Sequence, residues 1–253
     1  MAKTVAILNQ KGGVGKTTTA INFTAALRRL DRRVLLLDFD PQGNATSGMG
    51  VSKQSRPNAY DVLMGGEPAE RAVVPLPYGD VIPSNADLSG AEVLLVNRER
   101  REYQLKDALD PLRDRYDYIF IDCPPSLGLL PLNALTAADS ILVPLQCEYY
   151  AMEGIADLST TVKMARKRLN PTLEIEGILL TMFDSRLTFS SQVAAELRRY
   201  FAGKVYDAVI PRNVRLAEAP SHGRPITEYD RHSKGGRAYL AAAEEFLRRQ
   251  EEA

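Results

Sequence analysis

The chain has 253 residues, of which 45% are hydrophobic and 25% are charged, and its formal net charge is zero. These ordinary globular values allow a full hydrophobic core and point to no particular class of partner. Its two cysteines make no disulfide framework, and no apolar run reaches the roughly 18 residues of a membrane span, so we expect a soluble, cytoplasmic protein.

Short apolar runs alternate with helix-length segments along the chain. Runs that are apolar on both faces suit a parallel sheet with helices on both sides. The alternation therefore predicts an α/β fold, a doubly wound and mostly parallel sheet with helices on both faces. We expect strands over 4–9, 33–39, 116–122, 140–146, 175–183 and 204–211, and helices over 16–30, 126–138, 152–169, 188–202 and 236–250.

The region 50–115 is less regular than the rest. It begins with a loop-rich stretch, and the charged stretch 97–116 is expected to form a mostly exposed helix. No linker separates two bodies, so we expect one domain over residues 1–253. The first strand begins by residue 4, which leaves no room ahead of it for a separate N-terminal DNA-reading domain.

A glycine-rich stretch, NQKGGVGKTT, joins the first expected strand to the first expected helix. Gly15, Lys16 and Thr17 fit the end of the phosphate-binding loop G-x-x-x-x-G-K-[ST], although its first glycine is replaced by Gln10. Glycines let backbone amides turn around phosphate oxygens, and a helix N-terminus favours an anion. We expect Lys16 to reach the β- and γ-phosphates and Thr17 to bind Mg²⁺. The alternative is a glycine-rich turn without a ligand.

A second lysine, Lys11, precedes the glycines on the opposite side of the loop from Lys16. A lysine there cannot easily fold back onto its own nucleotide, but it could reach a phosphate held by a second subunit that faces it. The alternative is a surface lysine, which is the usual environment of this residue.

Several motifs together resemble the ParA/MinD family of P-loop ATPases. The stretch 11–18 looks like the deviant Walker A motif of that family, and 35–48 and 119–128 resemble its next two motifs in order and spacing. The stretches 143–154 and 209–226 resemble, more narrowly, the ParA/Soj branch, which partitions chromosomes and plasmids. The resemblance covers nearly the whole chain. It implies a P-loop NTPase fold and an ATPase, with ATP and Mg²⁺ as cofactors, that is slow without its partner.

The resemblance also implies partners and roles for individual residues. An ATP-sandwich homodimer forms on ATP binding, and in it Lys11 contacts the partner's nucleotide. Pro211 and Asn213 lie against the adenine. A ParB- or Spo-type centromere-binding protein stimulates hydrolysis, a DnaA-type replication initiator is a further possible partner, and the protein associates with the nucleoid. The loop residues expected to bind nucleotide are Lys11, Gly12, Gly13, Val14, Gly15, Lys16, Thr17 and Thr18.

Three aspartates stand at the ends of expected strands, where a doubly wound sheet places its ligands. Phosphoryl transfer needs Mg²⁺ near the phosphates and a group that orients the attacking water. Asp122, at the Walker B position, is expected to support Mg²⁺ directly or through water. Asp38 and Asp40 are two residues apart on an extended segment, so we expect them to point the same way. The resemblance assigns Asp40 to the water and Asp38 to the metal shell; the alternative is that one aspartate caps a turn.

Positive charge concentrates in residues 186–237. This segment holds ten Lys or Arg and five Asp or Glu, a net charge of +5, which leaves −5 for the rest of the chain. Non-specific affinity for DNA needs only a basic face, and no interleaved aromatic residues predict base stacking. We therefore expect sequence-independent binding to double-stranded DNA, although each residue could equally be a solvated surface group. The leading candidates are Arg186, Arg215, Arg224 and Lys234, followed by Arg198, Arg199 and Arg237.

Three other interpretations remain. A membrane-associated ATPase resembling MinD would end in a basic amphipathic helix, whereas four glutamates flank the apolar stripe in 238–253, which favours packing on the core. A protein resembling the nitrogenase iron protein would need cysteine thiolates around a cluster, whereas Cys123 and Cys147 end buried strands. A structural P-loop protein without turnover would not need both Asp40 and Asp122.

Overall fold

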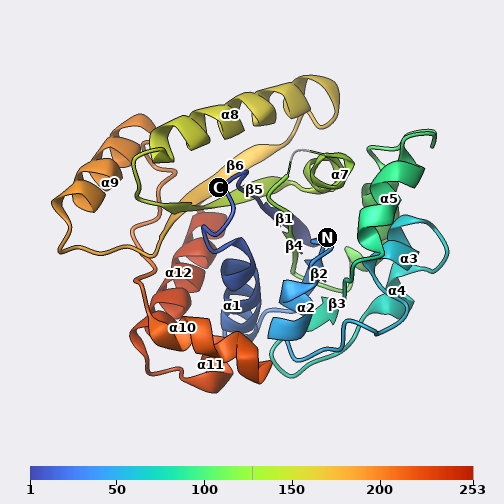
Figure 1. Ribbon diagram of the computed structural model, residues 1–253, viewed down its shortest axis with the longest axis horizontal. Helices are drawn as coiled ribbons and strands as arrows, with labels where there is room; N and C mark the ends of the chain where they lie inside the picture. The colour runs from blue at the N-terminus through green and yellow to red at the C-terminus, as the bar shows by residue number, and fades with distance from the viewer. Residues whose placement is uncertain (127, 253) are drawn as a thin grey trace.

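Six strands form one sheet in the computed structural model, which describes residues 1–126 and 128–252 (Figure 1). The strand order is β3-β2-β4-β1-β5-β6 and every pairing is parallel, which confirms the predicted doubly wound sheet. Leu127, inside an expected helix, and Ala253, at the end of the expected domain, lie outside the described residues. The strands are β1 (Lys3–Ile7), β2 (Val34–Asp38), β3 (Asp80–Ile82), β4 (Tyr118–Asp122), β5 (Ser140–Gln146) and β6 (Glu174–Thr181).

Helices cover both faces of the sheet, and the long helices α1 and α12, from opposite ends of the chain, lie side by side on one of them (Figure 1). That face carries α1 (Lys16–Arg29), α2 (Asn44–Gly48), α10 (Val214–Glu218), the 3-10 helix η2 (Ala219–His222), α11 (Ile226–Tyr229) and α12 (Lys234–Glu251). The other face carries α3 (Ala59–Leu63), α4 (Ala69–Ala72), α5 (Leu88–Leu95), α6 (Gln104–Leu109), the 3-10 helix η1 (Asp110–Leu112), α7 (Leu129–Ala137), α8 (Ala151–Arg168) and α9 (Thr188–Tyr200).

The central strands are apolar on both sides because each side packs against helices. In β2, Leu35 and Leu37 join the core beneath α3 to α9, whereas Val34 and Leu36 join the core beneath α1 and α12. Each such side chain stabilises the fold by about 1.5–3 kcal/mol relative to an exposed one. The sheet is therefore buried on both faces. The carboxyl ends of its strands meet at one edge, where ligands can be held.

The prediction of a strand over 204–211 is wrong. Among the described residues, it forms no continuous ladder with β6, and pairs with β6 and its continuation at its two ends, around Val205 and around Ile210. Between them, the backbone amides of Asp207 and Ala208 donate to the buried carboxylate of Glu245 on α12, at 2.9 and 2.8 Å. Glu245 thus takes the two amides in the middle of the segment and interrupts a strand ladder there. A hydrophobic pattern could not reveal an acceptor on another element.

The prediction of one charged helix over 97–116 is also wrong. The chain forms turns up to Tyr103, and only then do α6 and η1 follow. Arg100 adopts a positive φ of 50°, and Pro111 lacks the amide hydrogen that would extend a helix. Strand β3 was not predicted, because three residues are too few to show a period.

The apolar stripe of the C-terminal helix packs on the domain's own core, as predicted. Tyr239, Ala243 and Phe246 are fully buried or nearly so. Phe23 of α1 meets the Tyr239 and Phe246 rings edge-on, with centroids 6.4 and 6.0 Å apart. A search of the described helices for one with the length and apolar character of a membrane span finds none.

Candidate active site

The glycine-rich loop leads from β1 into α1 at the carboxyl edge of the sheet. Gly13 and Gly15 adopt φ values of 75° and 89°, a left-handed conformation that residues with side chains disfavour. Gly15 precedes α1 as its N-cap, and no side chain caps this helix. The first amides of α1 therefore remain available to an anion such as a phosphate.

Two hydrogen bonds from distant parts of the chain hold the loop in place. Asn9 donates from Nδ2 to the carbonyl of Pro144 in β5 at 2.8 Å, and Thr181 at the end of β6 donates from Oγ1 to the carbonyl of Val14 at 2.7 Å. Val14 itself is buried. A loop that is already ordered loses less conformational entropy when a ligand binds.

The two lysines of the loop have different surroundings. Lys16 is only 7% exposed, and its ammonium donates to the carbonyl of Lys11 at 3.0 Å. Burial lowers the pKa of Lys16, while the charges of Asp122 and Asp40 act to raise it. The Lys11 side chain is 43% exposed and pairs with Glu148 at 2.5 Å. Lys16 is therefore held within its own loop and the side chain of Lys11 is partly exposed, while their roles toward a nucleotide stay predictions.

Asp122 ends β4 with both carboxylate oxygens buried and without a hydrogen-bond partner among the described residues. Burial, and then the charge of Asp38, raise the pKa of Asp122 well above its usual range, while the side chains of Thr17 and Lys16 act to lower it. A buried carboxylate without a partner is costly unless a cation compensates it. Its oxygens and the Thr17 hydroxyl therefore fit a hard cation such as Mg²⁺.

Asp38 and Asp40 stand at the end of β2, beside β4, and Asp38 is opposite Asp122 in the sheet register. Oδ2 of the fully buried Asp38 accepts from both the amide and the hydroxyl of Thr46, each at 2.6 Å. Burial raises the pKa of Asp38 to about 6, and the hydrogen bonds from Thr46 act to lower it. Asp40 is 8% exposed, and its Oδ1 accepts from the Gln42 amide at 2.9 Å. Of the two, Asp40 is thus the one that is partly open.

Protein ligands for a metal are few at this edge of the sheet. Within residues 1–126 and 128–252, no group of three or more His, Cys, Asp or Glu is arranged to hold a metal ion. Mg²⁺ in phosphoryl-transfer sites takes one or two carboxylates, phosphate oxygens and waters, so a set of Asp122 and Thr17 is sufficient. Asp38 fits the predicted metal shell less well, because Thr46 occupies Oδ2 and the Asp40 amide donates to Oδ1 at 3.3 Å.

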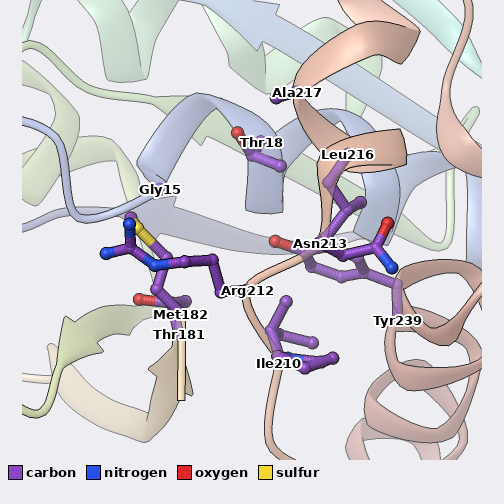
Figure 2. A pocket seen from close by; sticks show the side chains of 11 residues that line it. Gly15, Thr18, Thr181, Met182, Ile210, Arg212, Asn213, Leu216, Ala217 and Tyr239 are labelled. Atoms are coloured by element: carbon purple, nitrogen blue, oxygen red, sulfur yellow. The ribbon is translucent and has the colours of Figure 1, made fainter. Parts of the chain in front are cut away.

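A pocket of about 290 Å³ adjoins the loop (Figure 2). Gly15 and Thr18 contribute to it from the loop, and Pro211 and Asn213 contribute from a segment about 200 residues later. The side-chain oxygen of Asn213 is buried and has no hydrogen-bond partner among the described residues. An amide oxygen accepts hydrogen bonds, so it suits the exocyclic amino group of adenine. The other lining residues are Thr181, Met182, Ile210, Arg212, Leu216, Ala217 and Tyr239.

The sequence analysis missed several of these pocket residues. Thr181 lies at the carboxyl end of β6, so the strand-end rule could have identified it. Met182 follows it with a positive φ of 49°, which no sequence pattern predicts. Met182 and Arg212 also line a second cavity, of about 500 Å³, together with Glu148 and Asp184. The nucleotide-side pocket and the surroundings of Lys11 are therefore neighbours.

The four leading DNA-binding candidates are all exposed. Arg215 in α10 and Lys234 in α12 lie on adjoining helices, because Leu216 packs closely against Gly235. Arg224 follows η2, and Arg186 lies in the connection between β6 and α9. The structure thus places Arg215 and Lys234 on adjoining helices and Arg224 just after η2, which is continuous with α10.

Two of these arginines already pair with carboxylates of the same chain. The Arg186 side chain, 87% exposed, donates to Asp184 from Nε and Nη2 at 2.9 and 2.7 Å. Arg215 pairs with Glu218 at 2.9 Å. Glu218 is already counted in the segment's net charge of +5, but Asp184 lies just outside the segment, so the value overstates the positive charge around Arg186.

A family model described as an AAA domain matches residues 2–175. The chain is 54% identical over 252 residues to the chromosome partitioning protein ParA of Myxococcus xanthus, across 98% of this chain and 89% of that protein. It is 53% identical over 248 residues to the sporulation initiation inhibitor protein Soj of Bacillus subtilis, across 97% and 98%. Its fold is similar to the structure of cobyrinic acid a,c-diamide synthase from Mycobacterium smegmatis with bound ADP and magnesium, with a TM-score of 0.86, 39% identity and coverage of 99% and 96%.

Proposed function

This chain belongs to the ParA/Soj family of chromosome-partitioning P-loop ATPases, and we propose that it is an ATP-dependent DNA-segregation ATPase. In this proposal its ATP-bound dimer binds DNA without sequence preference, and hydrolysis releases the DNA. The observation that carries the proposal is the buried Asp122 carboxylate, which has no hydrogen-bond partner among the described residues. A structural P-loop protein without turnover would have no use for a buried charge at this position.

The nucleotide is ATP, with its phosphates on the loop and its base in the adjoining pocket. The amides that follow Gly15, together with the Lys16 ammonium, bind the phosphate oxygens. The side-chain oxygen of Asn213, which has no partner within the described part of the chain, accepts from the adenine amino group. Guanine presents a carbonyl at that point, so the same oxygen disfavours GTP.

Hydrolysis then depends on residues at the ends of neighbouring strands. Thr17 and Asp122 would hold Mg²⁺, which when bound neutralises charge that develops on the phosphate oxygens. Asp40, partly open to this site, accepts a hydrogen bond from the attacking water and orients it toward the γ-phosphate. Lys16 stabilises the negative charge on the transferred group.

A second subunit completes the site. Lys11 extends outward from the loop and pairs with the half-exposed Glu148, an ion pair of the kind that contributes about 0–1 kcal/mol. A phosphate on a facing subunit can therefore replace that partner at little cost. Tyr149 and Tyr150 follow Glu148 with their rings 5.0 Å apart and mostly exposed, and a facing subunit would cover them.

The DNA contacts come from exposed basic residues after β6. A monomer with few phosphate contacts binds weakly, with a dissociation constant on the order of 10⁻⁴–10⁻⁶ M for non-specific binding. A dimer presents the same residues twice on one body, so the second contact forms at high effective concentration. ATP is then the switch for DNA binding. The residues are Arg186, Arg215, Arg224 and Lys234.

The proposal includes partners that act on this cycle. Basal hydrolysis is slow, and a ParB-type protein accelerates it from a position beside the dimer interface. Association with DNA places the protein on the nucleoid, and a DnaA-type initiator is a further candidate partner. The names of the relatives, and a match over 89% and 98% of their length, support these roles. The synthase named above is less similar in sequence, at 39% identity, than the two partitioning relatives.

The experiment that tests this function measures sedimentation and DNA binding with ATP, with ADP and without nucleotide. We expect a dimer and DNA binding only with ATP, equal affinity for two unrelated duplexes and a steep loss of affinity with salt. Equal affinity in all three nucleotide states, or a strong preference for one duplex, would refute the proposal. Pelleting with anionic liposomes adds a check, because a MinD-like protein would sediment with them. The burial of Tyr239 and Phe246 predicts that this chain does not.

A further inference from the structure

Thr46 lies at the meeting point of three elements beside the site. It is fully buried in the first turn of α2. Its amide and its hydroxyl both donate to Oδ2 of Asp38, at 2.6 Å each, and its hydroxyl oxygen accepts from the Ser84 amide at 2.8 Å. Asp38 ends β2 and Ser84 follows β3, so this one hydroxyl joins two strand ends to a helix.

Hydrogen bonds from Thr46 also give two similar carboxylates, Asp38 and Asp122, different surroundings. Asp38 and Asp122 stand opposite each other on adjacent strands, and both are fully buried. Two carboxylates this close disfavour each other's charged form, and each needs compensation. Thr46 supplies two donors to Asp38, whereas Asp122 receives no hydrogen bond among the described residues. Asp122 is therefore the carboxylate left for a cation.

A second chain of contacts runs from Asp38 to the proposed catalytic group. Oδ1 of Asp38 accepts from the Asp40 amide at 3.3 Å, and the Asp40 carbonyl accepts from the Gly43 amide at 2.9 Å. Gly43 has a φ of 61°, and a Cβ there would lie 2.7 Å from the Ser84 carbonyl. The segment from Asp38 to Thr46 is thus a closed loop that fits tightly against the end of β3.

We propose that Thr46 is a positioning residue for ATP hydrolysis, whose hydroxyl fixes Asp38 and through it the backbone of Asp40. The proposal rests on the proposed function, because it assumes that Asp40 orients the attacking water. Thr46 does not contact the nucleotide in this scheme. Its loss should therefore slow the chemical step and leave ATP binding intact.

The test compares four full-length variants by steady-state hydrolysis of Mg·ATP and by binding of a fluorescent ATP analogue. Thr46→Val keeps the shape of the side chain but removes the hydroxyl, and Thr46→Ser restores the hydroxyl without the methyl group. Thr24→Val is the matched control, because Thr24 is also fully buried but its hydroxyl has no hydrogen-bond partner among the described residues. Asp40→Ala reports on the assumed catalytic role. Circular dichroism melting establishes that each variant is folded, and Thr46→Ala replaces Thr46→Val if the valine does not fold.

We expect Thr46→Val to lower kcat roughly tenfold, the effect of losing one hydrogen bond to a charged group, with KM and analogue affinity within about twofold. Thr46→Ser should recover most of kcat, and Thr24→Val should match the wild type. The proposal is overturned if Thr46→Val keeps the wild-type kcat while Asp40→Ala is inactive, if serine fails to rescue, or if only KM changes. Wild-type turnover by Asp40→Ala would instead show that the catalytic assignment itself is wrong, and the role of Thr46 would fail with it.

Discussion

The candidate active site at the strand ends and the basic segment 186–237 are built in opposite ways. Lys16, Asp38 and Asp122 are buried, and their surroundings come from elements far apart in the sequence. Arg186 and Arg215 are exposed, and each is held by a carboxylate no more than three residues away. A reaction needs atoms at fixed distances, whereas attraction between opposite charges needs only proximity. Single substitutions in the active site should therefore strongly reduce hydrolysis or ATP binding, whereas single substitutions in the basic segment should change DNA affinity only moderately.

The sharpest test of this contrast is Asp40→Ala. We expect hydrolysis to fall by roughly 100-fold or more, as for the loss of a group that positions the attacking water, while ATP affinity stays within about twofold. The variant should accumulate as an ATP-bound dimer. Phosphate release and sedimentation with ATP check both points, and wild-type turnover would remove Asp40 from the mechanism.

Variants of the two loop lysines distinguish ATP binding by one subunit from dimerisation of two subunits. Lys16→Ala should weaken ATP binding by the monomer roughly 10- to 100-fold, because a charge-assisted bond to phosphate is lost. Lys11→Ala should bind ATP as the wild type does but fail to dimerise. Titration with a fluorescent analogue at low protein concentration measures the first effect, and sedimentation with ATP measures the second. An equal loss of monomer affinity in both variants would contradict this division.

In the basic segment, Arg215→Glu should weaken DNA binding roughly tenfold for every sequence alike and flatten the salt dependence by about one to two units of slope. Dimerisation with ATP should not change. Arg71→Glu is the matched control, because Arg71 is another exposed arginine paired with a carboxylate, Glu67, but lies outside the segment. The contrast breaks if Arg215→Glu alters one duplex only, or if the control has the same effect.

The smallest expected effect is an increase in DNA affinity. Asp184→Asn releases Arg186 from its carboxylate and should tighten DNA binding about two- to threefold, the size of a weak surface ion pair. Hydrogen bonds from Arg186 lower the pKa of Asp184 to about 2. Because the pKa is lowered, the carboxylate stays charged above that value, and its competition with DNA should not vary between about pH 5 and 8. Glu67→Gln, which frees Arg71 instead, should leave DNA binding unchanged in fluorescence anisotropy.

The sequence predicted the loop and its lysines because these residues are consecutive and each has a local chemical role. It predicted the parallel sheet because buried strands are apolar on both faces. The proximity of Asn213 to Gly15 came only from family resemblance, since nothing local in either segment indicates the other. Near Asp207, a single glutamate on α12, Glu245, accepts the amide hydrogen bond that a strand partner would otherwise accept. No hydrophobic periodicity in the sequence identifies this glutamate. Thr46 was missed for the same reason: its partners are set by the fold and not by the motif.

The interrupted pairing of 204–211 with β6 has a consequence for self-association. A long, regular strand there would have given the sheet a new outer edge with unpaired amides and carbonyls, which invites pairing with another copy. Instead, two amides of this segment are taken by Glu245, and the opposite edge strand, β3, has only three residues. Both margins of the sheet are therefore poor templates for adding a strand. Uncontrolled growth into fibres through the sheet is therefore disfavoured.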